Sequence, residues 1–302
     1  MQAITPGESS RRRSTARVYG SVITATLLAL LVGVISPGTA LGRSGRYLDP
    51  IFSSVRRDAN LVYGRAIHTD GSVEKLKLDL YRPVGDTARN RPVVIFVHGG
   101  FQDTTTKDPA RNRLVGQLFA KRGFVAAVID YRSGAGVDSE AAWDLRAAVR
   151  WFRNNASLYR VSPSRIIAMG VSGGAIAAMT VTFNPEDAGT SGNPGYSSAV
   201  AAGISLSGTA SELYNIGFDE PPIAMIVAQD DVAFYAGTLA TCEETKAFGN
   251  VCEMFVYPEG GHPPPFWLEN SKKIIEQSSR FICRNVLGPV VCRDRNGDGR
   301  VD

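Results

Sequence analysis

Short apolar runs alternate with longer amphipathic segments along most of the chain after residue 75. Each run is short and rich in aliphatic residues, which is typical of strands buried on both faces of a sheet. Between the runs the apolar residues recur with helical spacing, most clearly in Ser139–Asn154, where Ala142, Leu145 and Phe152 share one face. This alternation predicts an α/β fold with a mostly parallel central sheet flanked by helices. The expected strands are Leu76–Tyr81, Val93–Val97, Val125–Ile129, Ile166–Met169, Ala201–Leu206, Ile223–Val227 and Glu253–Tyr257, and the expected helices are Arg111–Lys121, Ser139–Asn154, Ala175–Thr182, Thr238–Phe248 and Lys272–Arg284.

A Gly-x-Ser-x-Gly motif lies between one of these strands and the helix that follows it. Gly170, Ser172 and Gly174 come directly after the expected strand Ile166–Met169 and before a stretch of small residues. A serine hydroxyl is a weak nucleophile unless a tight strand-to-helix turn presents it to a base, and glycines let the strand and helix approach closely in such a turn. Ser172 is therefore the candidate nucleophile.

Three histidines are available as a general base: His68, His98 and His262. His262 lies in a glycine-rich loop just after the last expected strand, which is where a serine hydrolase of this strand order places its base. His68 lies far upstream, and we expect it to be structural.

The third member of such a constellation is a carboxylate at the end of a strand between Ser172 and His262. The strand Ile223–Val227 runs into two adjacent candidates, Asp230 and Asp231. Asp231 is the preferred acid. Asp230 is the alternative, because counting back from Tyr235 favours it. The other carboxylate is expected to be solvated, since two adjacent buried carboxylates repel each other.

Together these stretches resemble an α/β-hydrolase of the carboxylesterase type, similar to secreted esterases that carry a His-Gly-Gly loop. The resemblance extends from about Leu76 to about Arg284, and the spacing of Asp231 after Ala228 also fits it. It implies a Ser172–Asp231–His262 triad that hydrolyses an ester through an acyl-enzyme intermediate without a cofactor or metal. It also implies an oxyanion hole formed by the amide of Gly173 and by the His98-Gly99-Gly100 turn.

The motifs leave alternatives open. The same triad cleaves amides, so a serine peptidase or amidase is the second interpretation, and an inactive hydrolase-fold binding protein is the third. The expected partner is a small or polymer-linked ester, and the sequence specifies neither the acyl group, nor the alcohol, nor the oligomeric state. In the supporting segments, Asp130, Arg132 and Asp144 either form a buried ion-pair network or remain solvated.

The first forty residues have the pattern of a secretory signal. Arginines at Arg11–Arg17 precede the apolar segment Val18–Ile35, and small residues lead to an expected cleavage site after Ala40. An uncleaved membrane anchor is the alternative. The formal net charge of +4 includes +3 from this leader, which leaves +1 for residues 41–302 and gives no basic patch for nucleic acid.

Downstream of the leader we expect a single catalytic domain over residues 41–288 and a short tail over 289–302. The four cysteines support export, because an even number in a secreted protein indicates disulfides. Cys242–Cys252 and Cys283–Cys292 close the shortest loops and are the expected pairs. The tail from Asp294 to Asp302 resembles the first nine positions of a calcium loop but ends before the position of the bidentate glutamate, so a disordered tail is the simpler interpretation.

Overall fold

The computed structural model describes residues 45–68, 70–100, 110–132, 139–263, 265–288 and 291–292. All of them belong to one compact unit, Gly42–Asp302. The expected leader over residues 1–40 and the calcium-like tail from Asp294 lie outside the described residues, and both remain predictions.

An eight-stranded sheet forms the centre of this unit, in the order β1-β2-β4-β3-β5-β6-β7-β8. The first two strands are antiparallel to their neighbours, and every pairing from β4 to β8 is parallel. The strands are β1 (Val55–Ile67), β2 (Val73–Pro83), β3 (Arg91–Val97), β4 (Val125–Ile129), β5 (Val161–Val171), β6 (Ala202–Leu206), β7 (Ile223–Ala228) and β8 (Cys252–Tyr257). The expected α/β architecture with a mostly parallel sheet is confirmed.

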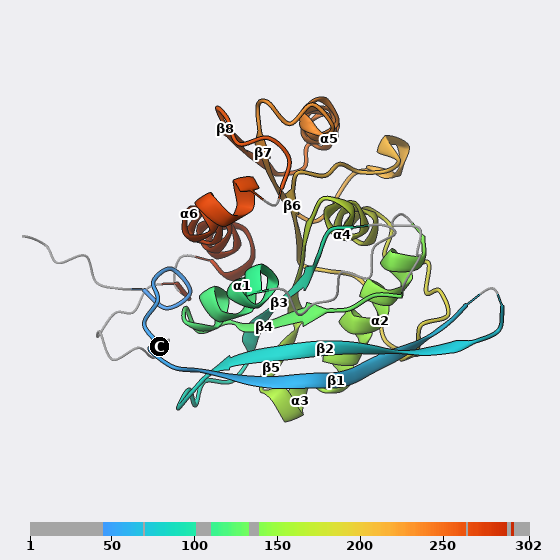
Figure 1. Ribbon diagram of the computed structural model, residues 1–302, viewed down its shortest axis with the longest axis vertical. Helices are drawn as coiled ribbons and strands as arrows, with labels where there is room; N and C mark the ends of the chain where they lie inside the picture. Colours follow the sequence, from blue (N-terminus) through green and yellow to red (C-terminus); the bar gives the residue numbers. More distant parts are fainter. Residues whose placement is uncertain are drawn as a thin grey trace, which may run out of the picture. The chain divides into compact units, whose positions relative to one another are not determined.

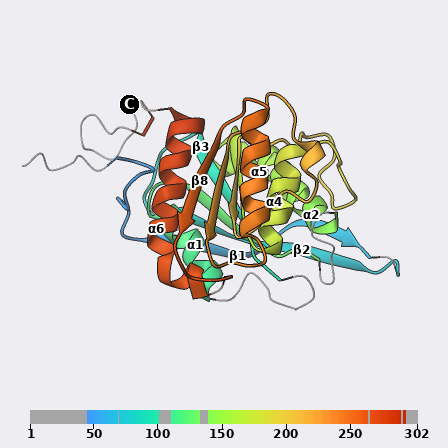
Figure 2. The same cartoon turned by 90° about the horizontal axis from the view of Figure 1, so that it is seen from above.

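Helices cover both faces of the sheet (Figure 1). They are α1 (Ala110–Ala120), α2 (Glu140–Asn154), α3 (Ala156–Tyr159), α4 (Gly173–Phe183), α5 (Tyr235–Ala247) and α6 (Pro265–Ile282), with a 3₁₀ turn at Leu213–Asn215 and a π-helical turn at Cys283–Leu287. One apolar core joins α1 and α6 to one face of the central strands, and the other joins α2, α4 and α5 to the opposite face. Figure 2 shows the same layers from above. The central strand β3 is buried along its whole length because helices cover it on both sides.

One long strand was not expected from the sequence. β1 extends over thirteen residues at the edge of the sheet, and most of its side chains are exposed or half-buried. An edge strand that packs little of its surface needs no continuous apolar run, so its sequence carries a weak hydrophobic signal. Helix α6 also begins seven residues earlier than expected, at Pro265 rather than Lys272.

The ion pair between Arg132 and Asp144 is buried beside the end of β4. The Arg132 guanidinium donates to Asp144 at 2.7 Å, and its backbone amide donates to the same carboxylate at 2.8 Å. The hydroxyl of Ser191 also donates to Asp144, at 2.6 Å. Burial alone would lower the pKa of Arg132, but the hydrogen bonds and charge of Asp144 outweigh it and raise the pKa. This pair therefore connects the end of β4 to α2. Arg132 and Asp144 form a buried ion pair and are not solvated charges.

Two disulfides are present, and they join the expected pairs. Cys242 on α5 bonds to Cys252 at the start of β8, and Cys283 bonds to Cys292. The first bridge fastens a covering helix to the outermost parallel strand. The second closes the segment after α6.

At Gly170 and Gly174, the packing of helix α4 against β5 and the end of β3 leaves no space for a side chain. A Cβ at Gly170 would lie 2.0 Å from the carbonyl oxygen of Gly174. A Cβ at Gly174 would lie 2.3 Å from the carbonyl oxygen of Val97, at the end of β3. Since all of these neighbours are backbone atoms, no rotamer change can relieve the contact.

We therefore expect Gly170→Ala to lower the free energy of unfolding by about 3 kcal/mol, the upper end for overpacking a buried site. Gly217→Ala is the matched control, because the nearest atom to its added Cβ is a flexible glutamate oxygen at 3.6 Å. Its effect should stay within about 0.5 kcal/mol, as for other surface changes. Urea denaturation of both variants measures the difference, and equal stability of the two would contradict the packing argument.

Candidate active site

Ser172 occupies the turn between β5 and α4. Its backbone has φ 54° and ψ −123°, a conformation that a residue with a side chain rarely adopts. The turn is held by the Ser172 amide, which donates to the carbonyl of Leu206 at 2.9 Å, and by the Ser172 carbonyl, which accepts from Ala175 at 2.8 Å. The strained turn thus presents the hydroxyl at the carboxyl end of the parallel strands.

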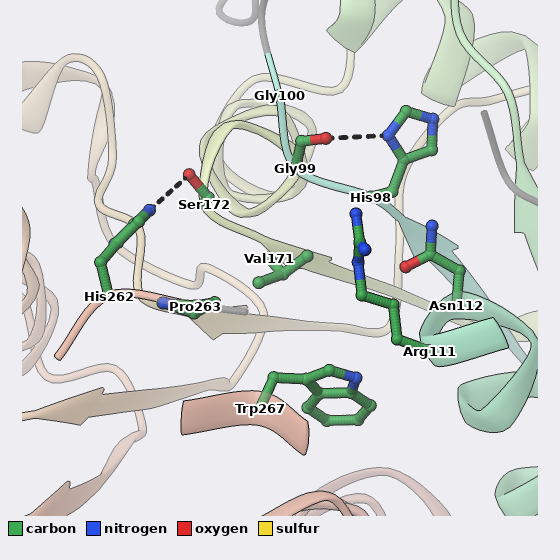
Figure 3. A pocket seen from close by; sticks show the side chains of 10 residues that line it. All are labelled: His98, Gly99, Gly100, Arg111, Asn112, Val171, Ser172, His262, Pro263 and Trp267. Atoms are coloured by element: carbon green, nitrogen blue, oxygen red, sulfur yellow. Dashed lines mark hydrogen bonds between the residues drawn. The ribbon is translucent and has the colours of Figure 1, made fainter. Parts of the chain in front are cut away.

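The imidazole of His262 faces this hydroxyl. Its Nε2 lies 2.9 Å from the Oγ of Ser172, although 90 residues separate the two in sequence (Figure 3). The ring of Phe234 stacks against the imidazole with centroids 5.1 Å apart. The loop that carries His262 contains Gly260 and Gly261, both at positive φ. These glycines allow the chain to turn back from β8 toward Ser172.

Asp231 lies on the other side of the imidazole. Its Oδ2 is 3.0 Å from Nδ1 of His262, and the residue is only 1% exposed. The other oxygen, Oδ1, accepts from the amides of Ala233 at 3.2 Å and Phe234 at 3.3 Å, just before α5. Backbone donors therefore hold the buried carboxylate in one orientation, with its second oxygen directed at the histidine.

Asp230 has a different set of contacts. Its carboxylate accepts from the amide of Gly261 at 2.8 Å and from that of Gly260 at 3.3 Å, the two residues before His262. The hydrogen bond from Gly261 is the largest cause of a lowered pKa for this exposed carboxyl. Asp230 is exposed to solvent, as expected for the second carboxylate, and it also accepts these two backbone hydrogen bonds. Asp230 thus connects the histidine loop to the end of β7. No residue pattern predicts this contact, because its donors are backbone amides.

The residues expected to form an oxyanion hole lie around Ser172. Gly173 is the first residue of α4, where amides have no partner within the helix. Gly99 comes so close that an added Cβ would be 3.1 Å from Cβ of Ser172, and Gly100 has φ +104°. The loop that carries them is supported from beneath, since the ring of Tyr131 stacks on His98 and its hydroxyl donates to the carbonyl of Gly100. Burial raises the pKa of Tyr131 to about 12, so this hydroxyl stays protonated as a donor.

A pocket of about 290 Å³ opens beside Ser172 and His262. Figure 3 shows the side chains around it. The sequence had indicated Ser172, His262 and the His98–Gly100 turn, but it had not indicated the other residues of the wall. Those residues are Arg111, Asn112, Val171, Pro263 and Trp267. Pro263 and Trp267 could have been predicted, because they follow His262 closely along the chain. Nothing in the sequence links Arg111 to this site.

The other two histidines, His68 and His98, have different surroundings. His68 is on the β1–β2 hairpin, where its Nε2 contacts Glu74 at 3.0 Å. His98 is buried, and its Nδ1 lies 3.0 Å from the carbonyl oxygen of Gly99. Within the described ranges, no group of three or more His, Cys, Asp or Glu side chains could hold a metal ion. Nor does any described helix have the length and apolar character needed to cross a membrane.

Comparison with known families gives one match in the centre of the chain. The family model BD-FAE matches residues 78–216, which include Ser172 but end before Asp231 and His262. A probable isoprenylcysteine alpha-carbonyl methylesterase of Arabidopsis thaliana is 37% identical over 113 residues, which is 37% of this chain and 23% of that protein. Phenmedipham hydrolase of Pseudarthrobacter oxydans is 31% identical over 118 residues, or 36% of this chain and 23% of its own length. The chain thus spans about a quarter of the length of these relatives.

Similarity to solved structures extends further along the chain. A thermophilic esterase from Thermogutta terrifontis, solved with propionate bound, superimposes with a TM-score of 0.64 and 24% identity, covering 74% of this chain and 93% of that one. The same esterase phosphonylated by cyclosarin gives a TM-score of 0.65, again at 24% identity. At this identity the likeness establishes the fold. The chain therefore has the α/β-hydrolase fold, and over part of its length it is similar to BD-FAE proteins and to carboxylesterase-type hydrolases.

Proposed function

We propose that the chain is a serine carboxylic-ester hydrolase with Ser172 as nucleophile, His262 as general base and Asp231 as the triad acid. The observation that carries this proposal is the continuous hydrogen-bonded chain from Ser172 Oγ through His262 to Asp231. Such a relay is the arrangement that activates a serine hydroxyl, and it lies at the mouth of a pocket.

In the first half of the proposed reaction, Ser172 Oγ attacks the carbonyl carbon of the ester while His262 Nε2 takes its proton. The carbonyl π electrons move to the oxygen, and the oxyanion accepts from the amide of Gly173 and from the Gly99–Gly100 turn. When the tetrahedral intermediate collapses, the bond to the alcohol oxygen breaks and the imidazolium protonates the leaving alcohol. An acyl-enzyme on Ser172 remains.

In the second half, water replaces the alcohol. His262 removes a proton from the water, the resulting oxygen attacks the acyl carbon, and the carboxylic acid leaves as Ser172 recovers its proton. Asp231 keeps the Nδ1 proton directed toward itself and stabilises the imidazolium in both halves. No cofactor or metal takes part in these steps.

The size of the pocket favours small esters. At about 290 Å³ it lies at the lower end of the range for small-molecule sites. A short acyl or alcohol group fits such a volume, and a long aliphatic chain would extend out of it. We therefore propose short-chain or polymer-linked esters as the substrate class.

We also propose export of the mature protein. The leader pattern of residues 1–40 supports it, as do the two disulfides, because bridges form and persist in oxidising compartments.

The nucleophile is tested first. We expect wild-type protein to hydrolyse para-nitrophenyl esters of short acids faster than those of long acids, and to react with a fluorophosphonate probe at Ser172. Ser172→Ala should lose both the labelling and the ester turnover. Ser211→Ala, which changes an exposed serine on the loop after β6, should keep both. Faster turnover of matched anilides would instead support the amidase, and labelling of another serine would contradict the assignment.

The two neighbouring carboxylates are tested by single Asn substitutions. Asp231→Asn should lower kcat by about 10⁴-fold, because an amide at this position holds the imidazole in the wrong tautomer. Asp230→Asn removes only one acceptor of the histidine loop and should lower kcat by about tenfold or less, the effect of one hydrogen bond. Steady-state kinetics decides between them, and the reverse order of losses would make Asp230 the acid.

Export is tested on protein made by secreting cells. Protein from the medium should begin near Leu41, and non-reducing peptide mapping should find both bridges and no free thiol. Intact residues 1–40 in a membrane fraction would support the uncleaved anchor instead. A Cys242–Cys283 peptide would show that the pairing is wrong.

A further inference from the structure

The pocket beside Ser172 contains hydrogen-bond donors that the proposed hydrolytic steps do not use. Arg111 and Trp267 both line it, and none of the ten described residues that line it is acidic (Figure 3). These two side chains come from different helices, α1 and α6, which pack against each other on one face of the sheet. We call Arg111 and Trp267 the donor pair.

Trp267 has an unsatisfied polar atom. The residue is 2% exposed, and its indole ring stacks near Phe96 with centroids 6.3 Å apart. Its Nε1 is buried and has no hydrogen-bond partner among the described residues. An indole N–H can only donate, and a buried donor without an acceptor is costly. In Figure 3 this nitrogen lies on the side of the ring toward Arg111. A ligand that brings an acceptor to this wall would satisfy it.

Arg111 supplies a positive charge to the same wall. It is half-buried in the first turn of α1, and its guanidinium has no ion pair or hydrogen bond with any residue that the structure describes. The other deeply placed arginines differ in this respect. Arg132 pairs with Asp144, and Arg46 pairs with Asp86. The first turn of α1 contains no acidic residue, so the positive end of the helix dipole adds to the charge of Arg111.

A group that suits this wall must accept hydrogen bonds and carry negative charge. A guanidinium binds the two oxygens of a carboxylate through parallel N–H bonds, and the indole can add a third bond to the same oxygens. One guanidinium balances one negative charge, which matches a carboxylate better than a phosphate dianion. The small pocket volume leaves room for only a short spacer between this group and the ester carbonyl.

We propose that the donor pair binds a carboxylate carried by the ester substrate, so that the preferred substrates are short esters with a free carboxylate. The inference rests on the proposed ester hydrolysis at Ser172 and specifies its substrate class. The carboxylate is located on either the acyl or the alcohol side of the scissile bond, and both sides share the same recognition chemistry.

The first measurement compares isosteric esters with and without the charge. On the acyl side, para-nitrophenyl hydrogen glutarate is paired with para-nitrophenyl isoheptanoate, in which an isopropyl group replaces the carboxylate. On the alcohol side, para-acetoxybenzoate is paired with para-isopropylphenyl acetate. The charged ester of at least one pair should have the higher kcat/KM by about tenfold or more, as expected for hydrogen bonds to a charged group. The pair that shows the preference identifies the side.

Variants of the donor pair then test the contacts. Arg111→Met keeps the length of the side chain and should lower the charged-to-neutral ratio of kcat/KM by about ten- to a hundredfold. Trp267→Phe keeps the ring and removes the N–H, and it should lower the ratio by about three- to tenfold. Arg113→Met removes an equal charge from the same helix outside the pocket lining, and its ratio should equal that of the wild type. Thermal melting of each variant confirms that the comparison is made on folded protein.

The outcomes separate the inference from the function on which it rests. Hydrolysis of the neutral esters with no preference for charge, or an Arg113→Met effect as large as that of Arg111→Met, overturns the donor pair and leaves the esterase standing. If no ester is hydrolysed, the proposed function fails, and the donor pair is tested by calorimetric binding of the same esters to Ser172→Ala protein. Tighter binding of a charged ester that Arg111→Met abolishes supports the inference there, and equal binding of both members of each pair overturns it.

Discussion

The close approach of helix α4 to the ends of β3 and β5 is the contact on which the rest of the site depends. Gly170 and Gly174 leave no space for a side chain between strand and helix, because the nearest neighbours of an added Cβ are backbone carbonyl oxygens. This approach is accompanied by a positive φ at Ser172 and brings Gly99 against its side chain. A longer distance between α4 and the sheet would relax the serine and separate it from the His98–Gly100 turn. The strain at Ser172 is thus sustained by the packing of the central sheet.

Charge is distributed unevenly around His262. Asp231 and Asp230 both come from the end of β7 and lie away from the pocket lining, one contacting the imidazole and the other the amides of the histidine loop. Among the described residues that line the pocket, Arg111 is the only one with a fixed charge. In the proposed reaction, a proton moved from Ser172 to His262 therefore creates a cation next to the fixed carboxylate of Asp231. An anionic group in the pocket therefore faces a cation, and none of the described lining residues carries a negative charge.

The two adjacent aspartates after β7 have different structural roles. Asp230 and Asp231 are neighbours in sequence, yet their side chains serve different partners because the chain turns sharply after β7. One carboxylate is buried and fixed by the amides that precede α5, and the other is exposed and fixes a second loop. This arrangement avoids the repulsion of two buried carboxylates, since only one of them is removed from water.

The sequence alone predicted the fold class and several candidate site residues of this protein. Continuous apolar runs separated by amphipathic segments determined the parallel sheet and its helices, because strands covered on both faces must be apolar throughout. The order of Gly170–Gly174, the Asp230–Asp231 pair and His262 indicated the three polar groups, since local motifs depend on local backbone geometry. The sequence did not predict the edge strand β1, because its exposed side chains form no continuous apolar run. Only the tertiary structure decided which aspartate faces the imidazole, that Asp230 holds the histidine loop, and that Arg111 from α1 and Trp267 from α6 share one pocket wall. Those facts depend on the directions of side chains and on contacts between segments distant in sequence, and hydrophobic periodicity carries no information about either.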